Sequence, residues 1–179
     1  TFAVRDYDLA ATLEGGQAFG WRPGAGSPAL HAALENPVQA RGSAADARSW
    51  EAVVRGTWVR LSLTPGGIRA ETAVPQRDWR WLAEYLRTEE DLDAVLATFP
   101  PDEPMRAAVA ACRGLRLLRQ EPWECLASFV LSSTKQIVQI RRMVGLLGER
   151  FGEPVAVPAG HPAAYAFPGA ARLAGVGET

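Results

Sequence analysis

The residues best suited to chemistry in this sequence form a short polar turn, Ser132 to Gln136 (SSTKQ), between two apolar segments. The turn contains Lys135, the only lysine among 179 residues. A helix that begins after such a turn offers free backbone N–H groups and the positive end of its dipole, and both favour a phosphate. The spacing from Ser133 to Gln136 is also that of a capping box. The turn therefore predicts either a phosphate contact or simply a capped corner between two helices.

A second candidate is the turn Gly15-Gly16-Gln17, which precedes Phe19. Paired glycines permit a positive φ or the close approach of a ligand to the backbone. An ordinary turn leading into a strand would use the same residues, so both interpretations stay open.

The remaining chemical residues predict no further site. His31 and His161 are solitary, and the sequence contains no GxGxxG, GxxxxGK[ST], HExxH or GxSxG motif. Cys112 and Cys125 lie in apolar helical patterns without CxxC spacing, which predicts buried free thiols in a reducing compartment. We expect neither a metal nor a cofactor.

The element that would position the glycine turn is an antiparallel sheet. Side chains alternate between apolar and polar from Trp50 to Val74, and Pro65-Gly66-Gly67 interrupts the pattern as a turn. The alternation predicts a hairpin with Val59 on its buried face, and with Trp58 on its solvated face.

Helical periodicity begins near Asp78. Trp79, Leu82, Ala83 and Leu86 share a face, a short helix follows over 91–98, and Asp102 or Glu103 could begin another. Two further helices flank the polar turn: Pro122 occupies a first-turn position, and Gly152 with Pro154 ends the second stripe. Their apolar stripes comprise Trp123, Leu126, Ala127, Val130 and Leu131, and then Ile137, Ile140, Val144, Leu147 and Phe151.

Charge changes sign at the Pro100-Pro101 junction. Residues 1–104 carry ten basic and fifteen acidic side chains, a balance of −5, whereas residues 105–152 carry eight basic and three acidic, a balance of +5. A basic block within a chain of net charge −1 suits a localised phosphate-facing surface, although solvated helix faces would give the same count. We predict one domain over 1–104 and the start of another over 105–179.

Composition is that of an ordinary soluble globular protein, with 47% hydrophobic residues and a mean hydropathy of −0.07. No apolar run approaches eighteen residues, so no membrane span is expected. The chain begins at Thr1 without Met and stops at Gly177-Glu178-Thr179 without a change of composition, so we expect a piece of a longer protein.

Four segments, in order along the chain, resemble a known family. They are LEGGQAFGWR (Leu13 to Arg22), EYLRTEEDLDAVLATF (Glu84 to Phe99), GLRLLRQEPWECLASFVLSSTKQIVQIRRMVGLLGERFG (Gly114 to Gly152) and AFPGAARLAGVG (Ala166 to Gly177). Together they resemble the 8-oxoguanine DNA glycosylases of the helix-hairpin-helix superfamily, and the third segment is the most specific. The resemblance implies an α+β fold: an antiparallel, TATA-binding-protein-like sheet domain followed by the first part of a helical glycosylase domain.

The resemblance also implies an activity. Members flip the damaged guanine out of duplex DNA, excise it, and cut the strand as AP lyases. Extruding a base costs a few kcal/mol, which contacts in the pocket and in the vacated gap must offset. The implied partner is double-stranded DNA containing oxidised guanine. We expect a monomer in the bacterial cytoplasm, associated with the nucleoid.

Site residues follow by matching positions. Gly16 would offer its backbone carbonyl to the N7–H that oxidised guanine has and normal guanine lacks. The residues at the gap left by the flipped base would be Ser133, Thr134, Lys135, Gln136 and Gln139. The family's best-known pattern has three asparagines where this chain has Thr134 to Gln136, and an arginine where it has Gln139, which affects the preference for cytosine opposite the lesion.

The family's nucleophilic lysine and catalytic aspartate match no residue here and are expected beyond Thr179. Lys135 matches the gap-filling segment, so we predict that these 179 residues alone do not excise the lesion. Two other hypotheses remain: a non-catalytic DNA-binding protein on the same scaffold, and a protein-interaction module that uses an exposed sheet face around Trp58.

Overall fold

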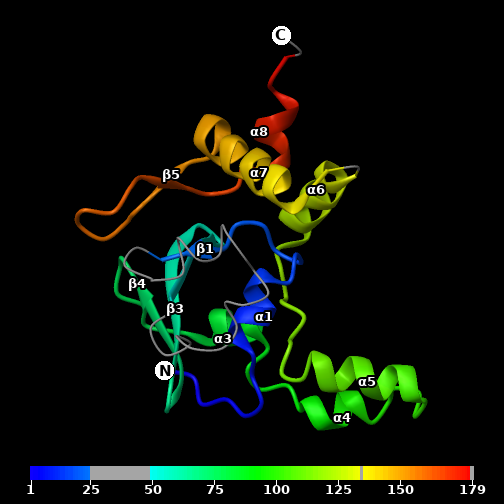
Figure 1. The fold of residues 1–179 in the computed structure, drawn as a ribbon. Coiled ribbons are helices and arrows are strands. Elements are labelled where there is room, and N and C mark those ends of the chain that lie inside the picture. The colour runs from blue at the N-terminus through cyan, green and yellow to red at the C-terminus, as the bar shows by residue number, and fades with distance from the viewer. Residues whose placement is uncertain (25–48, 134, 178–179) are drawn as a thin grey trace.

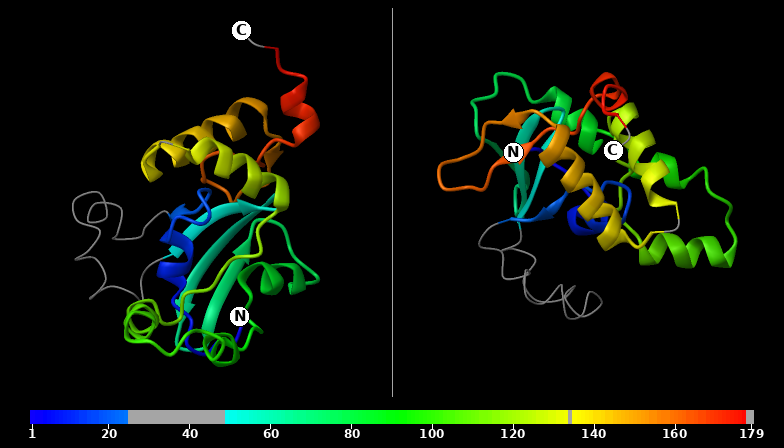
Figure 2. Two further views of the ribbon diagram at one scale, coloured as in Figure 1. Left: turned by 90° about the vertical axis from the view of Figure 1, so that its right-hand side faces the viewer. Right: turned by 90° about the horizontal axis from the view of Figure 1, so that it is seen from above.

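The computed structural model describes residues 1–24, 49–133 and 135–177. In these ranges a sheet packs against two helices, and two others lie across one end of it, with a short last helix running away from that end (Figures 1 and 2). A further pair of helices lies near the opposite end. This arrangement confirms the predicted α+β class. No helix in the described ranges has both the length and the apolar character needed to cross a bilayer.

The main sheet is antiparallel, with its described strands in the order β1-β2-β3-β4. The strands are β1 (Arg22–Pro23), β2 (Ser49–Val54), β3 (Thr57–Thr64) and β4 (Gly67–Thr72). The predicted hairpin is confirmed as β3 and β4, in which Leu61 lies opposite Ala70 and Leu63 opposite Ile68. The start of the alternating region forms a separate strand, β2, because the chain turns once more at Gly56, where φ is +73°.

The core lies between this sheet and the helices α1 (Leu9–Glu14) and α3 (Arg80–Leu86). The predicted apolar face of α3 is confirmed at Leu82 and Leu86, neither of which has measurable exposure. Leu9 and Leu13 of α1 enter the same cluster, although the sequence analysis did not predict α1.

The predicted solvated face of the hairpin was wrong at Trp58, which is only 3% exposed. His161, from the connection between β5 (Pro154–Val155) and β6 (Ala164–Tyr165), packs edge-on against the indole with ring centroids 5.2 Å apart. The Arg60 guanidinium lies 5.3 Å from the same ring. Because the connection folds back over the sheet, Trp58 cannot supply the exposed surface that an interaction module would use.

The helices expected after β4 are present, and aspartates cap two of them. In α4 (Leu92–Leu96), Asp91 accepts from the backbone of Ala94, and in α5 (Glu103–Ala111), Asp102 accepts from Met105. The predicted division after residue 104 falls in the first turn of α5, and it stays a prediction.

The two helices flanking the polar turn are α6 (Pro122–Ser132) and α7 (Ile137–Phe151), followed by α8 (Ala170–Ala174). Pro122 begins α6 and Gly152 ends α7, as predicted. The α7 stripe is buried at Ile140 and Val144, where it faces the rest of the chain.

The apolar side of α6 is not covered within the described residues: Leu126, Phe129 and Val130 are 57%, 73% and 63% exposed. The prediction of buried thiols was also wrong. Cys112 and Cys125 are both free and exposed, because one follows α5 and the other lies on the open side of α6.

Gly67 gives a test of the sheet. Its φ is +116°, and an added Cβ would lie 2.0 Å from the backbone oxygen of Phe2, which pairs with Ile68 beside it. We expect Gly67→Ala to lower the free energy of unfolding by more than about 2 kcal/mol, measured by urea denaturation. Gly66→Ala is the control, since its Cβ would meet only Thr64 Oγ1 at 4.0 Å. Equal losses in the two variants would contradict this account.

Candidate nucleic-acid interface

The glycine turn follows α1 directly and has the backbone that its sequence predicted. Gly16 has φ +82°, a value that side-chain-bearing residues rarely adopt. At Gly15 an added Cβ would lie 2.6 Å from the carbonyl oxygen of Ala11. Both glycines are therefore needed to end α1 and redirect the chain towards β1.

Gln17 anchors this turn to a distant extended segment. Its Nε2 donates to the carbonyls of Thr12 at 2.9 Å and Arg116 at 2.8 Å, while its Oε1 accepts from the backbone of Leu118 at 2.8 Å. The Gln120 side chain in turn donates to the Gln17 carbonyl at 2.6 Å. The sequence gives no sign of this role, since nothing near Gln17 indicates partners a hundred residues away.

The polar corner between α6 and α7 is held by local hydrogen bonds. The hydroxyls of Ser132 and Ser133 donate to the carbonyls of Phe129 and Val130, at 2.7 and 3.1 Å, and Lys135 N donates to Ser132 O at 3.2 Å. The serines therefore close α6, which satisfies carbonyls that the helix end leaves free.

The capping box predicted at Ser133 and Gln136 was wrong, because the observed one lies one turn later, at Gln136 and Gln139. Gln136 itself is the N-cap of α7, and its backbone N–H donates to Oε1 of Gln139 at 3.1 Å. The predicted capping chemistry occurs, but Ser133 is used by the preceding helix. Thr134 lies outside the described residues.

The glycine turn and the polar corner lie together in the fold. A Cβ added to Gly16 would lie 3.4 Å from Cδ1 of Ile137, the first residue of α7. The predicted corner residues Ser133, Lys135, Gln136 and Gln139 are all exposed. Beside them Ile137 and Val138 are 47% and 75% exposed, so the corner presents amide, ammonium and apolar groups on one surface.

This surface carries groups of the kinds that proteins use to contact duplex DNA. Lys135 makes no ion pair with another described residue, so its ammonium is free for a phosphate. Apolar side chains at such a position can enter the space between bases. No group of three or more metal-ligating residues occurs among the described residues.

Glu124, in the first turn of α6, has the most perturbed carboxyl among the described residues. Burial, and secondarily the charge of Glu121, raise the pKa of Glu124 from its usual 4.5 to about 7. Its carboxylate lies near Gly20, where an added Cβ would be 4.0 Å from Oε1. It belongs to the contact between α6 and the sheet rather than to the polar corner. Of the histidines, His161 packs on Trp58 and His31 lies outside the described residues.

Comparison with known proteins identifies related sequences. The family model for the N-terminal domain of 8-oxoguanine DNA glycosylase matches residues 1–126. An N-glycosylase/DNA lyase of Saccharomyces cerevisiae is 41% identical over 94 residues, which covers 51% of this chain and 24% of the yeast protein.

Solved structures show the same fold. MBOgg1 in complex with a low-affinity DNA ligand aligns with a TM-score of 0.74 at 23% identity, covering 95% of this chain and 51% of that protein. The Clostridium acetobutylicum 8-oxoguanine glycosylase/lyase, bound to double-stranded DNA with cytosine opposite 8-oxoguanine, aligns with a TM-score of 0.75 at 18% identity, covering 96% and 51%. The chain thus spans about half the length of these structures and about a quarter of the yeast relative.

Glu124 gives a pH-dependent test. A carboxyl whose pKa is higher in the folded than in the unfolded state binds its proton more tightly when folded, so its contribution to stability falls as pH rises from about 4.5 to about 7. Glu124→Gln removes this loss. The difference in unfolding free energy, variant minus parent, should therefore increase over that interval and level off above it.

The measurement is urea denaturation at pH 4.5 to 8, with Glu89→Gln as the control because Glu89 is exposed. A difference for Glu124→Gln that stays constant across this range would contradict the proposed burial effect.

Proposed function

Because the chain belongs to the 8-oxoguanine DNA glycosylase family, whose N-terminal domain it matches over 1–126, we propose that it is the amino-terminal part of a base-excision repair enzyme. That enzyme flips 8-oxoguanine out of duplex DNA, cleaves its glycosidic bond and cuts the strand as an AP lyase. The observation that carries the proposal is the position of Gly16 beside the first residue of α7.

This proximity suits base flipping, since the enzyme must hold the extruded purine while another group fills the gap it leaves. Those two tasks need surfaces close enough to act on one nucleotide and its former partner. The glycine turn and the polar corner meet this requirement, although about 115 residues separate them in sequence.

Gly16 would discriminate the lesion through its backbone. A carbonyl oxygen accepts a hydrogen bond from the N7–H of 8-oxoguanine and repels the N7 lone pair of guanine. The oxidised base would therefore bind more tightly than the normal one. The positive φ of Gly16 and its lack of a side chain support such a role, because the purine could approach the main chain closely.

The corner would support the opened duplex. Lys135 would contact a phosphate or a base edge, and Gln136 and Gln139 carry exposed amides that can donate and accept. Thr134 completes the proposed set. The side-chain oxygen of Gln139 accepts the hydrogen bond that caps α7. Its NH2 group would therefore be the donor to the strand opposite the lesion.

The covalent chemistry belongs to the rest of the enzyme. Lys135, the only side-chain amine in the chain, lies in the proposed gap-filling corner, and it forms no ion pair with any aspartate in the ranges that the structure describes. We therefore assign the nucleophilic lysine and the catalytic aspartate to segments outside these 179 residues.

The first test is activity. We expect this chain to show no release of 8-oxoguanine and no borohydride-trapped adduct with lesion-containing duplex, measured by denaturing gel electrophoresis. The complete enzyme is the positive control. An efficient adduct that disappears in Lys135→Ala would refute the assignment of Lys135 to the gap.

The second test is DNA binding by the complete enzyme. Lys135→Ala should weaken binding to duplexes of different sequence alike and reduce the slope of log K against log salt by about one, as expected for one lost phosphate contact. Arg77→Ala is the control, because Arg77 is exposed on the connection from β4 to α3. An unchanged salt slope in Lys135→Ala would exclude a phosphate contact at the corner.

A further inference from the structure

A cavity of about 330 Å³ lies between α7 and the sheet. Its walls come from the segment 19–22, from β2, from Glu124 of α6, from α7 and from residues 163–167. Neither Gly16 nor any described residue of the polar corner lines it, so it lies apart from the part of the proposed lesion surface that the structure describes. A volume of this size falls in the range of small-ligand sites, at its lower end.

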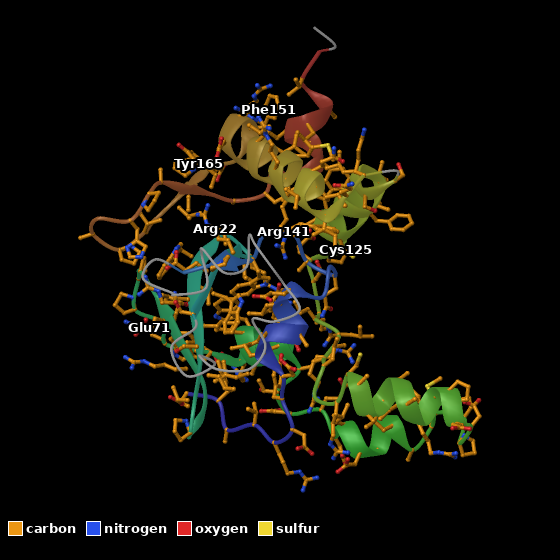
Figure 3. The ribbon with its side chains drawn as sticks, viewed as in Figure 1. Arg22, Glu71, Cys125, Arg141, Phe151 and Tyr165 are labelled. Atoms are coloured by element: carbon orange, nitrogen blue, oxygen red, sulfur yellow. The ribbon has the colours of Figure 1, made fainter. Side chains whose placement is uncertain are left out.

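Three arginines line this cavity: Arg22 from β1, and Arg141 and Arg142 from α7. Figure 3 shows Arg141 on the side of α7 that faces the sheet and Arg22 on the opposite wall. Within the described part of the chain, none of the three makes an ion pair or a side-chain hydrogen bond. Three unpaired guanidinium groups around one hollow favour an anion.

Arg141 gives the sharpest indication. Its Nε is buried and has no hydrogen-bond partner. A buried donor without a partner is unfavourable, and at a charged group the penalty is larger. An acceptor entering the cavity would remove it, since a guanidinium can bind two oxygens of one phosphate side by side.

Two carboxyls also line the cavity, Glu124 and Glu149, and neither forms an ion pair with an arginine that the structure describes. Burial raises the pKa of Glu124 to about 7, so the negative charge of its carboxyl is reduced near neutral pH. The arginines therefore outweigh the negative charge, and protonated Glu124 can donate a hydrogen bond to an anion.

The other walls suit a flat apolar group. Phe19, Tyr165 and Phe167 contribute aromatic rings, while α7 contributes Gly145 and Gly148. An added Cβ at Gly145 would meet nothing within 4 Å, so the helix leaves open space there. Aromatic rings beside arginines are the common surroundings of a nucleotide, whose base stacks while its phosphate pairs.

We propose that this cavity binds the phosphate group of a nucleotide, with Arg141 as its main ligand and Arg22 and Arg142 at the rim. The nucleotide could be a free mononucleotide or part of a DNA backbone, and the experiment distinguishes the two. The site acts independently of lesion recognition, so its failure would leave the proposed function intact.

The experiment follows the arginine Nε–H resonances of the 179-residue chain by NMR during titration with dGMP, with deoxyguanosine, and with an undamaged duplex. We expect dGMP or the duplex to shift the Arg141 resonance, and deoxyguanosine to leave it in place. Arg141→Met should raise the dissociation constant about tenfold. Arg142→Met, a change at an exposed position, should weaken binding in the same direction and guards against misfolding of the first variant.

The control is Arg150→Met, on α7 but outside the cavity. It should leave dGMP affinity unchanged. A response to dGMP identifies a free nucleotide as the source. A response to duplex alone, weakened by Arg141→Met but not by Arg150→Met, identifies the backbone. No response to either ligand, or equal weakening by Arg150→Met, would overturn the proposal.

Discussion

The hydrogen bonds of one side-chain amide, that of Gln17, hold the two candidate surfaces together. Its NH2 group donates to the carbonyls of Thr12 and Arg116, and its oxygen accepts from the backbone N–H of Leu118. The end of α1 is therefore fixed to the segment that leads into α6. Removing this amide would cost more stability than the net contribution of three hydrogen bonds, because it would also leave partly buried backbone groups without partners. The position of α6, and with it the corner beyond it, depends on this link.

Much of the fold could be predicted from sequence because its determinants are local. The β3–β4 hairpin follows from alternation around Pro65-Gly66-Gly67. The helices α4, α5 and α6 begin directly after an acidic N-cap residue whose side-chain oxygen accepts from the first turn, namely Asp91, Asp102 and Glu121. What could not be predicted is long-range. The alternating pattern predicts that Trp58 faces solvent. In the structure the connection that carries His161, about a hundred residues later in the chain, covers it.

The candidate site divides in the same way. Gly16 was identified by its residue type and by resemblance, and its positive φ agrees with that choice. Its contact with Ile137 could not be foreseen, because no periodic pattern links a turn after α1 to the start of α7. The capping of α7 was placed one turn too early, since Ser133 and Gln136 satisfy the spacing rule as well as Gln136 and Gln139 do. The roles of the corner residues towards DNA stay predictions.

The rarity of lysine in this chain has a practical consequence. Lys135 is exposed and is the only lysine in 179 residues, so the chain has a single reactive side-chain amine, and it sits on the surface proposed to meet the duplex. An amine-selective dye will therefore attach there and at the terminal amino group of Thr1, without any cysteine engineering. Attached at Lys135, such a fluorophore becomes a local reporter of whatever approaches the junction of α6 and α7.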